Sequence, residues 1–256
     1  MDMKAVILAG GYGTRLSEET LNQPKPMVKI GDRPIIWHIM KMYDFFGIRD
    51  FVICCGYKGY VLKEYFANYY LHNSNFTVDL KNNTTEILSD QSENWKITLV
   101  DTGNSTSTGG RLKRVSHLID STFMMTYGDG VSDVNLECLM HFHKKHGKEA
   151  TITAVQPPGR FGSIETNGSN VSNFAEKTQD TAGWINGGFF VLEPSVFARI
   201  SNDQVAWENE PIQSLVESNQ LAAYKHFGFW KPMDTLRDKN SLEEVWQSGT
   251  APWKLW

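Results

Sequence analysis

The chain has 256 residues, of which 41% are apolar and 21% charged, and its formal net charge is −4. This composition is typical of a globular protein with a large core, and the absence of a basic stripe argues against a protein that binds nucleic acid through phosphate contacts. No apolar run approaches the roughly 18 residues that cross a bilayer, and the odd number of cysteines, three, suits a reducing compartment. We therefore expect a soluble cytoplasmic protein with no nucleic-acid or membrane partner.

The first half of the chain alternates between short apolar runs and segments with helical periodicity. Residues 5–8 form an apolar run that ends in a glycine-rich loop, and residues 34–47 place apolar side chains on one helical face between a proline and a glycine. Further strands are predicted at 50–55, 96–100 and 122–127, further helices at 61–69 and 111–119, and a polar loop or irregular strands at 72–95.

The second half continues this alternation with more irregular β-structure. Helices are predicted at 136–147, 193–200, 210–217 and 238–247, strands at 150–156, 184–192 and 221–226, and a hairpin with an Asn-Gly turn at 164–171. Alternating strands and helices predict an α/β protein with a three-layer, Rossmann-like fold, in which a mixed but mainly parallel sheet lies between helices. We expect a single domain over residues 1–256, with smaller added β-structure in its second half.

The loop after the first strand carries the strongest functional signal. Three glycines between residues 10 and 13 allow consecutive amides to form an anion-binding nest, at the end of a strand where α/β sheets bind ligands. The P-loop pattern is absent, and Leu16 replaces the third glycine of the dinucleotide fingerprint. Arg15, Lys25 and Lys29 lie around a proline-stiffened turn, and such a cluster of cations beside a nest suits a polyphosphate.

These segments resemble the signature of the sugar-1-phosphate nucleotidylyltransferases. The matching residues are Leu8-Ala9-Gly10-Gly11-x-Gly13-Thr14-Arg15-Leu16, Pro24-Lys25-Pro26-Met27-Val28 and Ile30-Gly31-x-x-Pro34-Ile35. Further matches at 101–103, 108–114, 127–130, 157–162, 186–190 and 228–235 resemble one branch of this family. That branch joins CTP and glucose 1-phosphate to give CDP-glucose and pyrophosphate, and in bacteria this product generally leads to sugars of surface polysaccharides such as O-antigens.

The resemblance implies a set of site residues and a cofactor. Arg15, Lys25 and Asp129 are expected to be catalytic, and Asp129 and Asp234 to hold Mg²⁺, which prefers one or two carboxylates plus phosphate oxygens. The nucleotide is expected to contact Leu8, Ala9, Gly10, Gly11, Tyr12, Gly13, Thr14, Arg15, Lys25, Thr106, Thr108, Gly109, Gly110, Arg111 and Gly128. The sugar phosphate is expected to contact Tyr127, Gly162, Glu176, Lys177, Asn186, Gly187 and Gly188.

This assignment divides the domain into a nucleotide-binding half, 1–130, and a sugar-phosphate-binding half with the C-terminal helix, 131–256. One departure from the family pattern is Thr178, which stands where the family usually has a proline after the Glu-Lys pair. Taken without the resemblance, Asp129 is typical of a Gly-Asp-Gly turn and Asp234 of a helix N-cap.

Arg111 offers a way to select the base. Cytosine presents hydrogen-bond acceptors at N3 and O2, whereas uracil has an N3–H donor. A guanidinium aimed at these atoms would pair with cytosine and oppose uracil. The alternative is that Arg111 lies with Lys113 and Arg114 on a solvated helix face.

Other interpretations stay open. The same chemistry could use UTP or dTTP, and the chain could be a catalytically silent homologue that binds a nucleotide sugar. A Rossmann dehydrogenase is disfavoured by the missing glycine. His141, His143 and His146 are an unfavourable zinc site, because only the last two share a helical face, and no Gly-x-Ser-x-Gly nucleophile elbow occurs.

The C-terminus adds a structural expectation. Trp253 and Trp256 are costly to leave in water, so they either fold back on the core or meet another subunit. Members of the resembled family are often oligomeric, and we expect a homo-oligomer.

Overall fold

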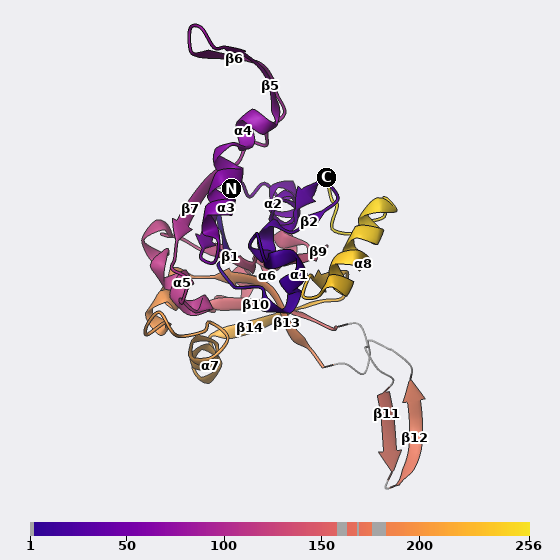
Figure 1. Cartoon of the computed structure of the whole chain (residues 1–256). Coiled ribbons are helices and arrows are strands. Elements are labelled where there is room, and N and C mark those ends of the chain that lie inside the picture. Colours follow the sequence, from indigo (N-terminus) through magenta and orange to yellow (C-terminus); the bar gives the residue numbers. More distant parts are fainter. Residues whose placement is uncertain (1–2, 158–162, 168, 176–182) are drawn as a thin grey trace.

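The computed structural model describes residues 3–157, 163–167, 169–175 and 183–256 (Figure 1). Within these residues, a seven-stranded sheet has the strand order β14-β10-β13-β8-β1-β4-β7. Its strands are β1 (Lys4–Ala9), β4 (Asp50–Cys55), β7 (Lys96–Asp101), β8 (Phe123–Tyr127), β10 (Ala150–Val155), β13 (Ile185–Leu192) and β14 (Leu221–His226). Strand β13 runs antiparallel to both of its neighbours, and the other paired strands run parallel. The predicted mixed, mainly parallel sheet is confirmed.

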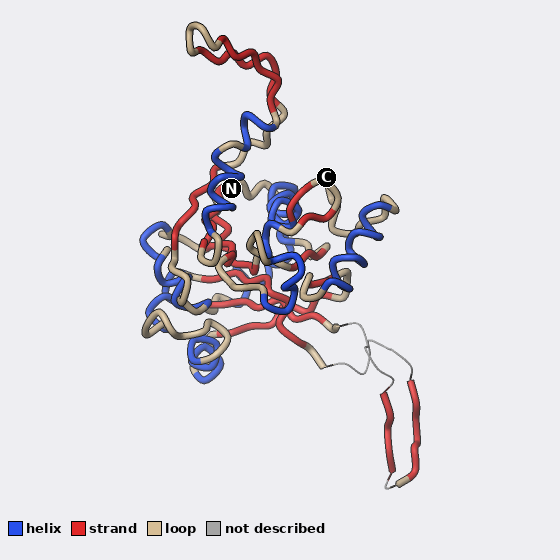
Figure 2. Tube along the Cα trace, viewed as in Figure 1, coloured by secondary structure: helices blue, strands red, loops and turns tan. Residues whose placement is uncertain are grey.

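Helices cover both faces of this sheet, because successive side chains of its strands point to opposite sides. In β1, Ala5 and Ile7 enter one core, and Val6 and Leu8 enter the other. The first core is closed by α2 (Ile35–Phe45), α3 (Gly59–Ala67), α6 (Leu136–His146) and α8 (Leu236–Gln247), and the second by α5 (Thr108–Arg114) and α7 (Glu210–Glu217). Figure 2 shows these helices on the two sides of the strands, which is the expected three-layer arrangement.

Two helical predictions need correction. The helix expected at 111–119 begins earlier, at Thr108, ends at Arg114 and is followed by a separate 3₁₀ turn, Ser116–Leu118. The segment expected as a helix at 193–200 is a 3₁₀ helix, Pro194–Arg199. In the first case the helix includes two glycines, which have a low helix propensity. Tertiary packing stabilises the helix there, and the periodicity of the sequence gives no sign of that packing.

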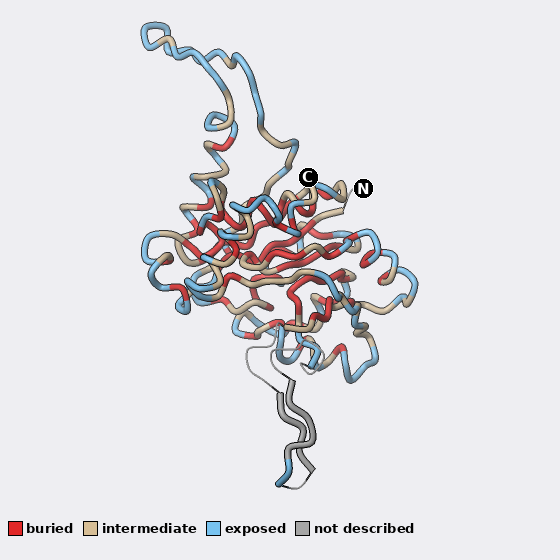
Figure 3. The backbone as a smooth tube through the Cα atoms, turned by 90° about the vertical axis from the view of Figure 1, so that its right-hand side faces the viewer, coloured by how far each residue is buried: buried red, intermediate tan, exposed pale blue. Residues whose placement is uncertain are grey.

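Two hairpins project from the body in different directions (Figure 1), and Figure 3 shows that the hairpin of residues 74–90 is mostly exposed. The polar segment at 72–95 forms β5 (Ser74–Asp79) and β6 (Thr84–Asp90), whose side chains are mostly exposed. The predicted Asn-Gly hairpin consists of β11 (Ser163–Asn167) and β12 (Asn170–Ala175).

The shorter elements are α1 (Ser17–Thr20), α4 (Tyr69–His72), the 3₁₀ helices Thr14–Leu16 and Lys25–Met27, and two strand pairs. These pairs are β2 (Lys29–Ile30) with β3 (Arg33–Pro34), and β9 (Gly130–Ser132) with β15 (Trp230–Pro232).

The C-terminal tail folds back on the first core. Trp253 is fully buried and stacks on Phe229 and Trp246, and Trp256 packs edge-on against Trp37. The sequence left open whether these tryptophans fold back on the core or meet another subunit. In the structure they fold back on the core of the same chain.

His38 is buried beneath this tail as a neutral ring. Its Nε2 lies 2.9 Å from the carbonyl oxygen of Ile30, and Trp253 Nε1 donates to its Nδ1 at 3.4 Å. These partners place the single ring proton on Nε2, and a second proton on Nδ1 would face the indole N–H. Burial lowers the pKa of His38 to about 4, against the opposing effect of the Ile30 carbonyl.

We expect His38 to make the protein sensitive to acid. Because its pKa is about 4 in the folded chain and near 6.5 in the unfolded chain, unfolding takes up a proton between these values. The free energy of unfolding should fall by about 3 kcal/mol between pH 7 and pH 4 on this account alone. Urea titrations should show a loss smaller by that amount in His38→Gln, whose amide can keep both hydrogen bonds. The exposed control His141→Gln should retain the wild-type pH dependence, and equal losses in both variants would contradict the assignment.

Candidate active site

A cavity of about 780 Å³ opens at the carboxyl ends of β1 and β8. This is the edge at which open α/β sheets bind ligands. Its described lining comprises residues 8–15, Lys25, Pro26, residues 104–108, Arg111, residues 126–130, residues 186–189, Ala206, Glu208, Trp230, Pro232 and Asp234.

The cavity brings together most of the residues expected from the sequence. Of the residues expected to contact the nucleotide, its wall includes Leu8, Ala9, Gly10, Gly11, Tyr12, Gly13, Thr14, Arg15, Lys25, Thr106, Thr108, Arg111 and Gly128. Of the residues expected to hold the sugar phosphate or the metal, it includes Tyr127, Asp129, Asn186, Gly187, Gly188 and Asp234. Gly162, Glu176 and Lys177 lie outside the described residues. Lys29 is exposed on β2 and does not belong to this lining.

Gly109 and Gly110 differ from expectation, because they face the protein rather than the cavity. A Cβ on Gly109 would lie 2.7 Å from the carbonyl oxygen of Val205, and one on Gly110 would lie 2.4 Å from that of Asp203. The two glycines therefore allow α5 to approach the backbone of the loop before α7, and this packing accounts for their presence.

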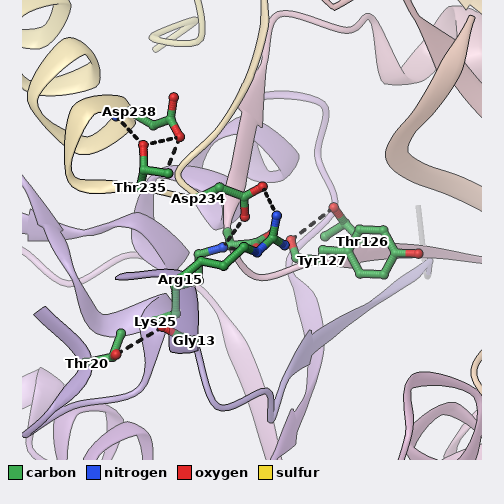
Figure 4. A network of polar contacts seen from close by, with 10 residues as sticks. Gly13, Arg15, Thr20, Lys25, Thr126, Tyr127, Asp234, Thr235 and Asp238 are labelled. Carbon is green, nitrogen blue, oxygen red and sulfur yellow. Dashed lines mark hydrogen bonds and ion pairs between the residues drawn. The ribbon is translucent and has the colours of Figure 1, made fainter. Parts of the chain in front are cut away.

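Two cations and two carboxylates meet at one end of the cavity (Figure 4). The Lys25 ammonium lies 2.6 Å from Asp129 Oδ2 and 2.7 Å from Asp234 Oδ1, and Arg15 Nη1 lies 2.9 Å from Asp234 Oδ2. The Arg15 side chain is 74% exposed and that of Lys25 is 10% exposed. The sharing of one ammonium brings the two carboxylates together, although they are 105 positions apart in the sequence.

The charge of Lys25 is held by these carboxylates. Burial alone would lower its pKa, but the charges and hydrogen bonds of Asp129 and Asp234 outweigh that effect and raise it. Lys25 is therefore cationic at neutral pH. The stability that depends on the Lys25 proton is present below about pH 10 and is lost as the pH rises through the raised pKa of Lys25.

The glycine-rich loop leaves main-chain donors free beside this cluster. The Gly10 carbonyl turns inward, where it accepts from the Tyr57 amide at 3.1 Å and from Arg111 Nη2 at 3.0 Å. Among the described residues, the amides of Gly11, Tyr12 and Gly13 donate to no protein acceptor. Gly13 adopts a left-handed conformation, with φ 66°, as is typical of an anion nest.

Arg111 is buried and braces this loop. Its two terminal nitrogens donate to the carbonyl oxygens of Gly10, Cys55, Gly103 and Asn104 and to the hydroxyl of Thr102. Desolvation lowers the pKa of Arg111, but such a group stays protonated at neutral pH. The alternative of a solvated helix face is wrong, since the residue is only 4% exposed.

Glu208 is a cavity residue that the sequence analysis missed. It lies in the connection between the 3₁₀ helix Pro194–Arg199 and α7, outside every recognised motif. Its carboxylate accepts from Thr108 Oγ1, at 2.6 Å, and from the hydroxyl of Tyr127. Nothing in the local sequence singles it out, because both partners are distant in the chain.

The donor set at the cluster fits a small, hard cation. In the described part of the chain, no group of three or more His, Cys, Asp or Glu side chains could enclose a metal ion. Asp129 and Asp234 nevertheless point their oxygens at one cationic position, now taken by the Lys25 ammonium. Two carboxylates plus phosphate oxygens form the kind of site in which proteins bind Mg²⁺ with a nucleotide.

Comparison with known proteins places these features in context. A nucleotidyl transferase family model matches residues 4–235. The chain is 57% identical over 256 residues to a glucose-1-phosphate cytidylyltransferase of Salmonella typhimurium, covering 99% of this chain and 100% of that protein. It is 42% identical to a probable glucose-1-phosphate cytidylyltransferase of Bacillus subtilis, with the same coverage.

Solved structures share the fold. A UDP-glucose pyrophosphorylase in complex with UDP-glucose superposes with a TM-score of 0.69 at 17% identity, over 97% of this chain and 100% of that one. The HddC protein of Yersinia pseudotuberculosis superposes with a TM-score of 0.69 at 20% identity, over 95% of this chain and 99% of that one.

Among the described residues, none of the helices has the length and apolar character needed to cross a membrane.

We expect Arg111→Met to destabilise the fold, because it removes the hydrogen bonds of a buried guanidinium to several carbonyl groups. The Gly10 and Cys55 carbonyls keep backbone amide donors, so the loss comes from the charged hydrogen bonds themselves. It should lower the free energy of unfolding by about 3 kcal/mol. Chemical denaturation would measure this loss. The control Arg237→Met, at an exposed position on α8, should change stability by about 0.5 kcal/mol or less. A comparable small change in Arg111→Met would contradict the bracing role.

Proposed function

The chain belongs to the nucleotidyl transferase family, and from this premise we propose that it transfers the CMP moiety of CTP to α-D-glucose 1-phosphate, giving CDP-glucose and pyrophosphate. Identity of 57% to a glucose-1-phosphate cytidylyltransferase over 99% of the chain supports this choice of both substrates. The observation that carries the chemistry is the cluster of Arg15, Lys25, Asp129 and Asp234 beside the free loop amides.

The substrates themselves provide the nucleophile and the leaving group. A phosphate oxygen of glucose 1-phosphate forms a bond to the α-phosphorus of CTP, while the bond from that phosphorus to the bridging oxygen of pyrophosphate breaks. Negative charge grows on the departing pyrophosphate. The loop amides and Arg15 would hold the β- and γ-phosphates, and Lys25 would lie against the reacting phosphates, so positioning and charge neutralisation drive the reaction.

Asp129 and Asp234 would hold Mg²⁺, which supplies positive charge against the triphosphate when it is bound. Lys25 pairs with both carboxylates and, together with Arg15, balances their two negative charges. With CTP bound, the Lys25 ammonium would turn from the carboxylates toward the reacting phosphates. The exposed Arg15 can exchange its single ion pair with Asp234 for phosphate at little cost, because surface ion pairs contribute little stability.

The remaining assignments divide the cavity between the two substrates. Tyr127, Asn186 and the glycines after it would receive the sugar phosphate, together with Gly162, Glu176 and Lys177. Residues 1–130 and 131–256 would act as the two halves of one catalytic domain. Recognition of cytosine N3 and O2 by Arg111 requires that the guanidinium exchange part of its carbonyl contacts for the base.

We further propose that the protein is a cytoplasmic homo-oligomer that supplies CDP-glucose for surface polysaccharides such as O-antigens. Its three cysteines, two of them buried, are free, as suits a reducing compartment. The β5–β6 hairpin exposes Phe76, Val78, Leu80 and Leu88. A two-stranded hairpin is marginally stable alone in water, so a second copy of the chain is the proposed cover for these side chains.

Substitution at the charge cluster tests the mechanism. We expect Lys25→Ala and Asp129→Asn to lower kcat at least about 10²-fold, because each removes a charge that acts on the reacting phosphates. Pyrophosphate release would be measured, with thermal unfolding to show that the variants are folded. Removal of Mg²⁺ by a chelator should abolish turnover, and calorimetric Mg²⁺ binding in the presence of CTP should be lost in Asp129→Asn. The exposed control Lys145→Ala should keep wild-type kcat, and a fully active Asp129→Asn would refute the metal role.

Product identification decides between the proposed reaction and its rivals. The wild-type enzyme should form CDP-glucose from CTP and glucose 1-phosphate faster than any product from UTP, dTTP or GTP, or from other sugar phosphates. Faster formation of UDP- or dTDP-glucose would show that the nucleotide is wrong. Failure to release pyrophosphate with any pair would favour a silent binding homologue.

The exposed hairpin allows a separate test of assembly. We expect the double variant Leu80→Ser/Leu88→Ser to sediment as a smaller species than the wild type in analytical ultracentrifugation, because it removes apolar area from the proposed contact. The exposed control Phe227→Ser, at the other end of the sheet, should sediment like the wild type. A monomeric wild type would contradict the proposal.

A further inference from the structure

Glu208 places a carboxylate in a cavity that is proposed to receive two phosphate-bearing substrates. A negative charge there repels both substrates, so the residue has to contribute something else. In the described part of the chain, its partners are two hydroxyl groups rather than a cation. Thr108 Oγ1 donates to one carboxylate oxygen at 2.6 Å, and the hydroxyl of Tyr127 donates to the other.

The hydrogen bond to Glu208 determines the direction of the Tyr127 hydroxyl proton. An ionised glutamate can only accept hydrogen bonds, and the phenol has a single proton to donate. Burial, followed by the charge of Glu208, raises the pKa of Tyr127, so the phenol keeps this proton. The phenol oxygen remains as an acceptor, and Asn186 Nδ2 donates to it at 3.3 Å.

The Asn186 side-chain amide is thereby held at both ends. Its Oδ1 accepts from the amide of Gly188 at 2.8 Å, and its Nδ2 donates to Tyr127. Within the described part of the chain, the second proton on Nδ2 has no protein acceptor, so it is available to a ligand in the cavity that Asn186 lines. Glu208 acts on this donor through the phenol, without touching Asn186 itself.

The main chain keeps Tyr127 and Asn186 in a fixed relation. Gly188 has φ 78°, and a Cβ at this position would lie 2.7 Å from Cδ2 of the Tyr127 ring. The ring therefore packs directly on the main chain that follows Asn186. Thr126 Oγ1 donates to the carbonyl oxygen of Gly188 at 2.9 Å and secures the same segment to β8.

The sheet order places Asn186 at the end of the cavity that suits the second substrate. Strand β13 lies beside β8, on the side away from β1, and its antiparallel direction brings its first residues to the carboxyl ends of the parallel strands. The glycine-rich loop follows β1, and Asp129 follows β8, so Asn186 lies across Asp129 from that loop. In-line attack needs the sugar phosphate on the side opposite the departing pyrophosphate.

We propose that Glu208 is a positioning residue for glucose 1-phosphate: by fixing the phenol proton of Tyr127, it holds the Asn186 amide as a hydrogen-bond donor toward the oxygen atoms of this substrate. The inference rests on the proposed function, in which Asn186 receives the sugar phosphate. The role requires an acceptor at position 208 and not a negative charge. Glutamine fulfils it, because its oxygen accepts from Tyr127 while its nitrogen donates to Thr108 Oγ1.

The test compares two substitutions of Glu208 in steady-state kinetics. We expect Glu208→Ala to raise KM for glucose 1-phosphate at least about fivefold, the effect of one lost hydrogen bond, and to change KM for CTP less than about twofold. Glu208→Gln should keep KM for glucose 1-phosphate within about twofold of the wild type. Equal effects of the two substitutions would show that the charge matters and would overturn the proposal. The exposed control Glu210→Ala, outside the described cavity lining, should keep both KM values.

A second variant tests the route through Tyr127. Tyr127→Phe should also raise KM for glucose 1-phosphate, and adding Glu208→Ala to it should cause little further change, because both act on one chain of hydrogen bonds. Full additivity would indicate direct contact between Glu208 and the sugar and would overturn the proposal, as would an unchanged KM in a folded Glu208→Ala protein.

Crystal structures of the ligand-free variants test the geometry without turnover. The contact between Asn186 Nδ2 and the Tyr127 hydroxyl should persist in Glu208→Gln and be lost in Glu208→Ala. An unchanged Asn186 side chain in Glu208→Ala would overturn the positioning role. Failure of the wild type to form CDP-glucose would instead contradict the proposed function, while these structures would still decide whether Glu208 orients Asn186.

Discussion

The cavity depends on the ends of three parallel strands, and the buried guanidinium of Arg111 holds these ends together. Arg111, in α5, donates to the Gly10 carbonyl after β1, to Cys55 at the end of β4, and to the segment after β7. Parallel strands end at the same edge, and the Gly10 and Cys55 carbonyls there each accept from a backbone amide and from Arg111. Because the Gly10 carbonyl faces Arg111, the amides of the next residues stay available to an anion.

The electrostatics of the site follow from this arrangement. The amides of the glycine-rich loop contribute partial positive charge, and Lys25 and Arg15 add two full charges. Asp129 and Asp234 balance these two cations. The same carboxylates suit a divalent cation that accompanies a triphosphate.

Much of the fold was predictable because its signals are local. The predicted bounds of β4, α7 and β14 agree with the structure, since each is an apolar run or a periodic segment between turn-forming residues. The prediction was wrong at the start of α5, where Gly109 and Gly110 argue against a helix. Their close contacts with the backbone at Asp203 and Val205 stabilise it, and those contacts join parts of the chain more than ninety residues apart. Long-range packing of this kind leaves no local pattern.

The sequence alone determined the glycine-rich loop, the two cations near it and the α/β architecture. These depend on residues that are close together in the chain, or on periodicities that any strand or helix must satisfy to bury one face. Only the tertiary structure decided which atoms those residues meet. It paired Asp234 with the same lysine as Asp129. It also brought Arg111 within hydrogen-bond distance of the Gly10 carbonyl, and Glu208 within hydrogen-bond distance of Thr108 and Tyr127. Hydrogen-bond polarity inside a cavity arises from such contacts, because a hydroxyl is a donor or an acceptor only in relation to the partner that folding brings to it.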